Sequence, residues 1–156
     1  MSPELICLTP QHTAYLEQIA KIERGAFSQP LSEAQLRDCA QSPDYRIDAW
    51  IADDIVLSYV VMQIVAQEVQ ILSVASVEKN KGYASALLIR CIQNLHKNEL
   101  ANCIYLEVRC SNTAAKHVYD KLGFICDGIR KNLYDFPKED GYIMHMEVTE
   151  SCLYSE

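Results

Sequence analysis

Apolar residues near the N-terminus of this chain are spaced as they are on one face of a helix. Between residues 15 and 22 they recur every three or four positions. Thr9-Pro10 predicts the start of this helix, because threonine is a good N-cap and proline is favoured at the first helical position, and Gly25 predicts its end. Ser32-Glu33-Ala34-Gln35 has the pattern of a capping box and predicts a second, short helix that runs to about Cys39.

The spacing changes to alternation at residue 45. Ile47, Ala49 and Ile51 alternate with polar neighbours, which is typical of a half-buried strand, and Asp53-Asp54 predicts a turn after it. The same criteria predict strands over 55–65, 69–77, 103–108, 124–129 and 142–148 and helices over 82–95 and 112–122. The predicted order is therefore ααβββαβαββ. Antiparallel strands followed by strand–helix alternation indicate a mixed α/β (α+β) domain rather than a doubly wound parallel sheet.

Length and composition narrow the class of protein. The chain has 156 residues, of which 49% are hydrophobic and 22% charged, so we interpret residues 1–156 as one folded domain with its core at about 5–148. The longest apolar runs are only a few residues, and the N-terminus lacks a basic flank before an apolar stretch. We therefore expect a cytoplasmic protein without a membrane span or signal peptide. The seven cysteines have no C-x-x-C spacing, which favours free thiols and no metal site.

Charge is distributed unevenly along the sequence. The net charge of −7 argues against nucleic-acid binding. Residues 78–131 contain nine basic and five acidic residues, whereas residues 1–77 contain four basic and ten acidic ones, and residues 132–156 one basic and six acidic ones. The basic middle segment would suit an anionic ligand, and the acidic remainder a cationic partner. A chance distribution of solvated surface charges would produce the same pattern.

A strand, a basic turn and a helix follow one another between residues 74 and 95. The turn reads Lys79-Asn80-Lys81-Gly82-Tyr83-Ala84, and the helix continues from Ser85. The first backbone N–H groups of a helix have no partner within it, and together with the helix dipole they form an anion site. Gly82 and Ala84 would let a pyrophosphate approach the backbone closely. An ordinary helix start with solvated lysines has the same sequence pattern.

A second strand–turn–helix unit follows between residues 106 and 124. It carries Asn112, Ala115 and Tyr119 on one stripe of the helix, then Gly123 to end the helix and Phe124 to open the next strand. In this unit, and in the earlier basic turn, the sequence resembles the GNAT (Gcn5-related N-acetyltransferase) superfamily. The resemblance implies the acyl-CoA N-acyltransferase fold, a central, mostly antiparallel mixed sheet flanked by helices, with acetyl-CoA as co-substrate.

Within this superfamily, the sequence is similar to the bacterial ribosomal-protein-alanine N-acetyltransferases of the RimI type. The similarity rests on Leu106-Glu107-Val108-Arg109, on Arg130-Lys131-Asn132-Leu133-Tyr134 and on Lys138-Glu139-Asp140-Gly141-Tyr142-Ile143-Met144. It implies an N-acetyltransferase that modifies the N-terminal alanine of a small-subunit ribosomal protein by direct transfer in a ternary complex. We expect a monomer whose partner is a basic protein N-terminus, without nucleic-acid or membrane binding.

The resemblance also implies roles for individual residues. Glu107 would be the proton acceptor, Tyr119 the proton donor and Tyr134 a contact for the acceptor substrate. The backbone at Leu72, Ser73 and Val74 would hold the pantetheine arm and polarise the carbonyl. The other acetyl-CoA contacts are expected at Lys79, Asn80, Lys81, Gly82, Tyr83, Ala84, Ser85 and Asn112.

The sequence departs from the RimI pattern at Leu31, where the family has an aromatic residue, and at Ala75-Ser76, where it has Asp-Pro. Alternatives also remain for the two catalytic candidates. A glutamate on a strand beside Arg109 can be a surface ion pair, and Tyr119 can be a core aromatic. At the level of function, the alternatives are a GNAT enzyme that acetylates a small amine, such as a polyamine or aminoglycoside, and a non-catalytic CoA-binding module.

Overall fold

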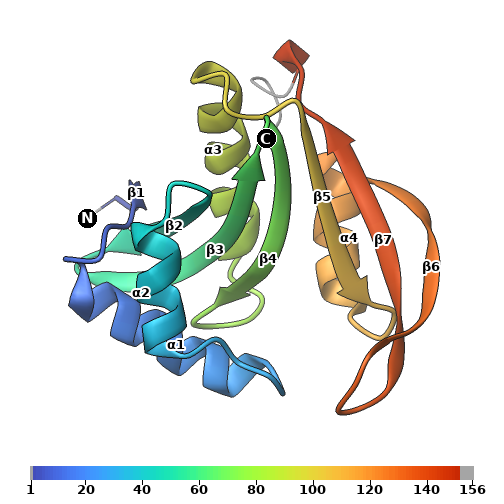
Figure 1. The fold of residues 1–156 in the computed structure, drawn as a ribbon, viewed down its shortest axis with the longest axis horizontal. Coiled ribbons are helices and arrows are strands. Elements are labelled where there is room, and N and C mark those ends of the chain that lie inside the picture. The colour runs from blue at the N-terminus through green and yellow to red at the C-terminus, as the bar shows by residue number, and fades with distance from the viewer. Residues whose placement is uncertain (1, 152–156) are drawn as a thin grey trace.

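The computed structural model describes residues 2–151 and contains one seven-stranded sheet covered by helices on both faces (Figure 1). The strands lie in the order β1-β2-β3-β4-β5-β7-β6, and among these neighbours β4 and β5 are parallel while the others are antiparallel. The predicted mixed α/β class is confirmed. The elements are β1 Glu4–Cys7, α1 Thr13–Ala26, α2 Glu33–Gln41, β2 Tyr45–Ala52, β3 Ile55–Val65, β4 Glu68–Ser76, α3 Tyr83–Lys97, β5 Cys103–Arg109, α4 Thr113–Leu122, β6 Ile125–Tyr134 and β7 Glu139–Glu147.

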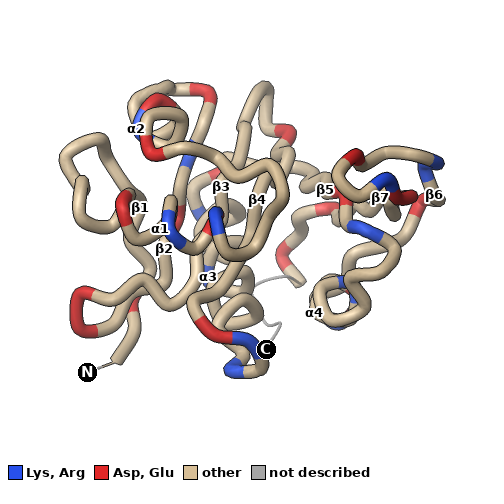
Figure 2. The backbone as a smooth tube through the Cα atoms, turned by 90° about the horizontal axis from the view of Figure 1, so that it is seen from below, with Lys and Arg blue, Asp and Glu red and all other residues tan. Residues whose placement is uncertain are grey.

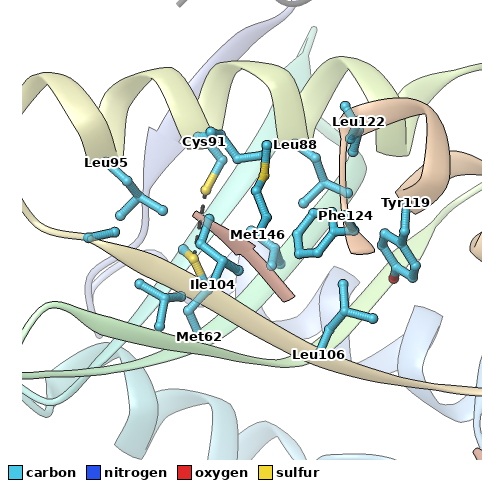
Figure 3. Close-up of a cluster of buried hydrophobic side chains, with 14 of the residues drawn as sticks. Met62, Leu88, Cys91, Leu95, Ile104, Leu106, Tyr119, Leu122, Phe124 and Met146 are labelled. Atoms are coloured by element: carbon cyan, nitrogen blue, oxygen red, sulfur yellow. Dashed lines mark hydrogen bonds between the residues drawn. The ribbon is translucent and has the colours of Figure 1, made fainter. Parts of the chain in front are cut away.

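Alternate residues of β3 point into two separate cores. Tyr59 and Val61 pack with α1 and α2, whereas Val60 and Met62 pack with α3 and α4. Figure 3 shows the second core, in which side chains of α3 lie over the strands and the rings of Tyr119 and Phe124 lie side by side at one end. The two cores hold the helices on opposite faces of the sheet.

Strands β4 and β5 separate within the sheet. They pair where residues 68–70 face residues 103–105, and then diverge (Figure 1). β4 also contains a bulge, because Val61 of β3 pairs with Ser73 while its neighbour Met62 pairs with Ile71, which leaves Leu72 between the two pairs. A bulge bends its strand and interrupts regular pairing. Beyond residue 70, one edge of β4 therefore lies along an opening rather than against β5.

Most predicted elements are present, but the N-terminal segment differs from the prediction. Strand β1 was not predicted, because it has only four residues and pairs with β2 alone. Helix α1 begins at Thr13 rather than Thr9, because residues 9–12 form a turn in which the His12 N–H donates to the Thr9 carbonyl over 3.0 Å. The capping box of α2 is confirmed, since Ser32 and Gln35 each donate a backbone N–H to the other's side chain.

The C-terminal hairpin is longer than predicted. β6 continues to Tyr134 and β7 begins at Glu139, and these two residues pair with each other after a register shift that begins at Arg130. Apolar and polar residues do not alternate along β6, because most of its side chains are exposed to solvent. The sequence pattern therefore did not reveal the full length of this strand. The added length extends the hairpin along the opening between β4 and β5.

Two further properties follow from the described residues. Across 2–151, the structure has no helix that is both long enough and apolar enough to span a bilayer. The cysteines in this range are free thiols, from the exposed Cys7 to the buried Cys91, and no three His, Cys, Asp or Glu side chains in it are grouped as a metal site. The seventh cysteine, Cys152, lies outside the described residues.

Candidate active site

The opening between β4 and β5 contains a cavity of about 370 Å³. The two diverging strands form its sides, and the β6–β7 hairpin contributes the remaining wall. Its charged lining residues are Glu107 and Arg130, and the others are polar or apolar. The full lining is Gln70, Ile71, Leu72, Tyr105, Leu106, Glu107, Arg130, Tyr134 and Ile143.

Glu107 forms an ion pair with Arg130 across this cavity. The Arg130 guanidinium nitrogen lies 3.3 Å from Glu107 Oε2, and the side chain of Glu107 is 37% exposed. Glu107 is thus part of a surface ion pair, as one interpretation of the sequence allowed, but its partner is Arg130 and not the neighbouring Arg109, which is bound to the β6–β7 loop. The carboxylate of Glu107 therefore remains open to the cavity, where Arg130 is its charged neighbour.

Arg109 instead fixes the loop that carries Tyr134. Its guanidinium donates to the carbonyls of Pro137 (2.8 Å) and Asp135 (3.1 Å) and pairs with Glu139 over 3.2 Å. The same guanidinium lies over the Tyr134 ring, 4.5 Å from its centroid. These contacts orient Tyr134 so that it lines the cavity with Glu107.

Glu139 is held from a second side as well. Its other carboxylate oxygen accepts the backbone N–H of Ser111, at 2.6 Å, from the turn before α4. The hydrogen bonds from Ser111, together with Arg109, lower the pKa of Glu139. The carboxylate thus ties the start of β7 to the end of β5.

Tyr119 lies on α4, packed edge-on to Phe124 with ring centroids 5.7 Å apart (Figure 3). It is 8% exposed and does not itself line the cavity. Burial raises its pKa to about 12, and Tyr134 lies close enough to contribute to this rise. A phenol in this state keeps its proton near neutral pH and can donate it.

The three residues of β4 that were predicted to hold the pantetheine arm lie in different surroundings. Leu72, at the bulge, lines the cavity; Ser73 is buried and its hydroxyl donates to Glu23 of α1; and Val74 packs against the α3 core. Since β5 has already diverged, the backbone groups on this side of β4 have no strand opposite them. Such an edge can hydrogen-bond an extended ligand as a neighbouring strand would.

Helix α3 begins directly beyond the open end of β4. Gly82 is its N-cap with φ of +74°, and a side chain built there would meet no atom within 4 Å. Lys79, Asn80 and Lys81 lie exposed in the turn before it, and Tyr83, Ala84 and Ser85 form its first residues. The first N–H groups of this 15-residue helix have no partner within the helix and no side-chain cap, as an anion site requires.

Asn112 caps the other helix of the site. Its side-chain oxygen accepts the backbone N–H of Ala115 over 3.2 Å, at the start of α4. The amide nitrogen takes no part in this cap, so it can donate in the predicted contact with acetyl-CoA.

The structure thus brings Leu72, Glu107 and Tyr134 together in one cavity, with the α3 turn at the end of β4 and Tyr119 behind Tyr134. Sequence reasoning missed the other lining residues, which are Gln70, Ile71, Tyr105, Leu106, Arg130 and Ile143. Alternation could have found Tyr105, which lies two positions before Glu107 on the same face of β5. For Arg130, the one sequence signal was its position in the RimI-like segment 130–134. Its contact with Glu107 depends on the register between β6 and β7, which no local pattern predicts.

The charges do not separate into two faces. Figure 2 shows acidic and basic residues on both sides of the divergence between β4 and β5. The fold therefore places basic and acidic residues near one another, although they are unevenly distributed along the sequence. At the cavity itself the two charged residues are of opposite sign and paired.

The combination of this split sheet with a helix N-terminus at the end of β4 corresponds to a known family, and residues 13–124 match the acetyltransferase (GNAT) family. The chain belongs to the GNAT acetyltransferases. It is accordingly an N-acetyltransferase with acetyl-CoA as its acetyl donor. A [ribosomal protein bS18]-alanine N-acetyltransferase from Haemophilus ducreyi is 31% identical over 132 residues, which cover 81% of this acetyltransferase and 90% of the relative.

Solved structures agree with this assignment. The ribosomal-protein-S18-alanine N-acetyltransferase from Escherichia coli has a TM-score of 0.83 at 27% identity, covering 94% of both chains. Arabidopsis thaliana NAA60 in complex with acetyl-CoA has a TM-score of 0.80 at 18% identity, covering 94% of this chain and 99% of that one, and it shares the fold. The expected GNAT fold is confirmed.

Proposed function

We propose that this acetyltransferase modifies protein N-termini, and specifically the N-terminal alanine of a small-subunit ribosomal protein. The observation that carries the proposal is the cavity between β4 and β5, where Glu107 faces Tyr134 of the long hairpin. The ribosomal acceptor is supported by the relatives from Haemophilus ducreyi and Escherichia coli, which are named for alanine acetylation of ribosomal protein S18.

Two features of the chain fit acetyl-CoA. The unpaired edge of β4 from Leu72 to Val74 offers backbone groups to the amides of the pantetheine arm. The N-terminus of α3, with open space at Gly82 and lysines in the turn before it, offers N–H groups and positive charge to the pyrophosphate. Bound acetyl-CoA supplies the thioester from which the acetyl group is transferred.

Glu107 is the residue we expect to take a proton from the acceptor amine. An α-amine with a pKa of about 8 costs only about 1.4 kcal/mol to deprotonate at pH 7, whereas a lysine amine at about 10.4 costs about 4.6 kcal/mol. A single carboxylate therefore suits an N-terminal amine better than a lysine. The incoming ammonium would replace Arg130 as the cationic neighbour of Glu107 Oε2.

Tyr119 is the residue we expect to return a proton to the departing sulfur. Its burial keeps the hydroxyl protonated, with a pKa raised to about 12. Such a donor needs no metal and no covalent enzyme intermediate. Transfer is then direct, with both substrates bound together.

The function is tested by comparing three acceptors in the presence of acetyl-CoA, with mass spectrometry as the readout. These are a basic peptide that starts with alanine, the same peptide with a blocked N-terminus and a free lysine, and spermidine. Only the free N-terminus should be acetylated at an appreciable rate. If spermidine is acetylated as fast, the protein is a small-amine acetyltransferase, and if no acceptor is acetylated while CoA binds, the proposed N-terminal acceptor is wrong.

The role of Glu107 has its own variant pair. Glu107→Gln should lower kcat by about 10²–10⁴-fold, the usual contribution of general acid–base catalysis. Glu68→Gln, on the exposed start of β4, is the matched control and should leave kcat unchanged. Equal kcat values for the two variants would show that Glu107 forms a surface ion pair and is not the base.

A further inference from the structure

A buried acidic residue on α1 lies outside the roles assigned so far. Glu23 is 1% exposed, and its carboxyl accepts three hydrogen bonds. The donors are the Leu31 N–H, over 2.8 Å to Oε1, and the hydroxyls of Tyr59 and Ser73, both to Oε2. All three donors are neutral groups.

These three donors belong to three different parts of the fold. Leu31 lies at the end of the connection between α1 and α2, Tyr59 on β3, and Ser73 on β4 directly after the bulged Leu72. Figure 1 shows the α1–α2 connection at the end of the molecule where β4 and β5 are farthest apart. One carboxyl group therefore links that connection with the edge of β4 that lines the cavity.

A buried acid is costly to a fold unless its oxygens are fully hydrogen-bonded, and an apolar residue would fill the same space more favourably. Packing alone therefore does not explain a glutamate here. Two of the donors lie beside irregular backbone, because Ser73 directly follows the bulge at Leu72 and Leu31 lies outside any helix or strand.

We propose that Glu23 is a positioning residue for acetyl transfer, which fixes the Leu72 bulge through Ser73 and the entry to α2 through Leu31. The first contact holds the β4 backbone beside the cavity, and the second holds the α1–α2 connection at the end of the molecule where β4 and β5 are farthest apart. Small misplacements of substrate-aligning groups lower rates strongly, so both contacts should affect turnover. The proposal rests on the acetyl-transfer part of the proposed function and not on which amine is the acceptor.

The test compares Glu23→Gln and Ser73→Ala with Ser58→Ala as matched control. Ser58 is a buried serine on β3 whose hydroxyl donates to the Ala75 carbonyl over 2.8 Å without contact to Glu23. Ser73→Ala should lower kcat by about tenfold at nearly constant acceptor KM, because only the β4 contact is lost. Glu23→Gln should lower kcat and raise the acceptor KM, because both contacts are weakened.

Two further readouts separate positioning from simple destabilisation. Hydrogen exchange of the free protein, which involves neither substrate, should accelerate at residues 72–74 in Ser73→Ala and Glu23→Gln but not in Ser58→Ala. The double variant Glu23→Gln/Ser73→Ala should lower kcat no more than Glu23→Gln alone, because the two residues share one contact.

The proposal is overturned if Ser73→Ala and Ser58→Ala have equal kcat and equal exchange at residues 72–74, or if the effects of Glu23→Gln and Ser73→Ala are additive. If Glu23→Gln does not fold, Ser73→Ala alone decides the β4 contact. Failure of the ribosomal acceptor would appear as inactivity of the unmodified protein toward the alanine peptide, with the exchange result unchanged.

Discussion

At the scale of single residues, Tyr119 and Glu107 have opposite surroundings. Tyr119 is 8% exposed and packs against Phe124, whereas the side chain of Glu107 is 37% exposed beside Arg130. Burial favours the neutral form of a phenol, while exposure lets water solvate a carboxylate charge. One group is thus suited to keep a proton until it is needed and the other to accept one.

Tyr119→Phe tests this division. The ring and its packing against Phe124 remain, but the only donor proposed for the departing sulfur is lost. We expect kcat to fall by about 10²–10⁴-fold while CoA affinity, measured by calorimetry, stays the same. A loss below about threefold in a folded variant would make Tyr119 a core aromatic and nothing more.

The raised pKa of Tyr119 also predicts how stability changes with pH. Because the folded-state pKa is about 12 and an unfolded tyrosine titrates near 10, the stabilisation is complete below about pH 10 and is lost as pH rises toward 12. Between pH 9 and 12, the free energy of unfolding of Tyr119→Phe should therefore fall by on the order of 2–3 kcal/mol less than that of the unmodified protein. Thermal unfolding at a series of pH values measures this difference. Parallel curves for the two proteins would contradict the burial of this phenol.

At the scale of elements, local sequence patterns predicted the structure correctly where it is determined by residues close together in the sequence. The capping box of Ser32 and Gln35 and the turn at Asp53-Asp54 are present as predicted. Strand β1 could not be predicted, because its four residues become a strand only by pairing with β2. The predicted start of α1 at Thr9-Pro10 was wrong for a local reason, because residues 9–12 form a turn before the helix begins at Thr13.

The turn before α3 gives a prediction for the cofactor. Gly82→Asp adds a side chain and a negative charge at the N-cap, beside the first helix N–H groups, so CoA affinity should fall by about tenfold or more. Gly82→Asn, of equal size and without charge, is the control for the strained φ of +74° and should have a smaller effect. Lys79→Ala should change affinity least. Calorimetry with unchanged affinity for Gly82→Asp would remove the pyrophosphate from this turn.

The hairpin gives a prediction for the acceptor. A methyl group at Gly141 would lie 2.5 Å from Leu133 Cδ2 and 2.9 Å from Tyr134 Cε2, so Gly141→Ala must displace the Tyr134 ring. The acceptor KM should rise about threefold or more while CoA affinity is unchanged, because Tyr134 is the residue expected to contact the acceptor. Gly25→Ala, in α1 with no atom within 4 Å of the new methyl, is the control and should leave both values unchanged. An unchanged acceptor KM in Gly141→Ala would argue against contact by Tyr134.

At the scale of the whole molecule, the site depends on long-range contacts that the sequence does not display. The helix stripe and the glycine turn predicted Tyr119 and Gly82, because each signal lies within one strand–turn–helix unit. The pair of Glu107 with Arg130 joins residues 23 positions apart through the hairpin register, and the contact of Glu23 with Ser73 joins residues 50 positions apart. Neither pair has a local pattern.

Overall charge gives a prediction for the acceptor that does not depend on any one contact. The net charge is −7, so the molecule as a whole attracts a basic peptide. Attraction of a basic peptide over distances beyond about 8 Å is screened at physiological salt. Raising salt should therefore increase the KM of a basic alanine peptide much more than that of acetyl-CoA, whose expected contacts are backbone hydrogen bonds. Equal salt effects on the two constants would refute long-range attraction.

The divergence of β4 from β5 also affects solubility. An unpaired strand edge usually occurs at the rim of a sheet, where charged or bulged residues discourage other chains from pairing with it. Here such an edge lies in the middle of the sheet, beside the exposed Leu72, and it must stay available for turnover. The bulge at Leu72 is one feature of this edge that discourages such pairing, and a ligand bound along the edge would add a second. If acetyl-CoA binds there as proposed, the ligand-free protein should self-associate more readily than its complex with CoA.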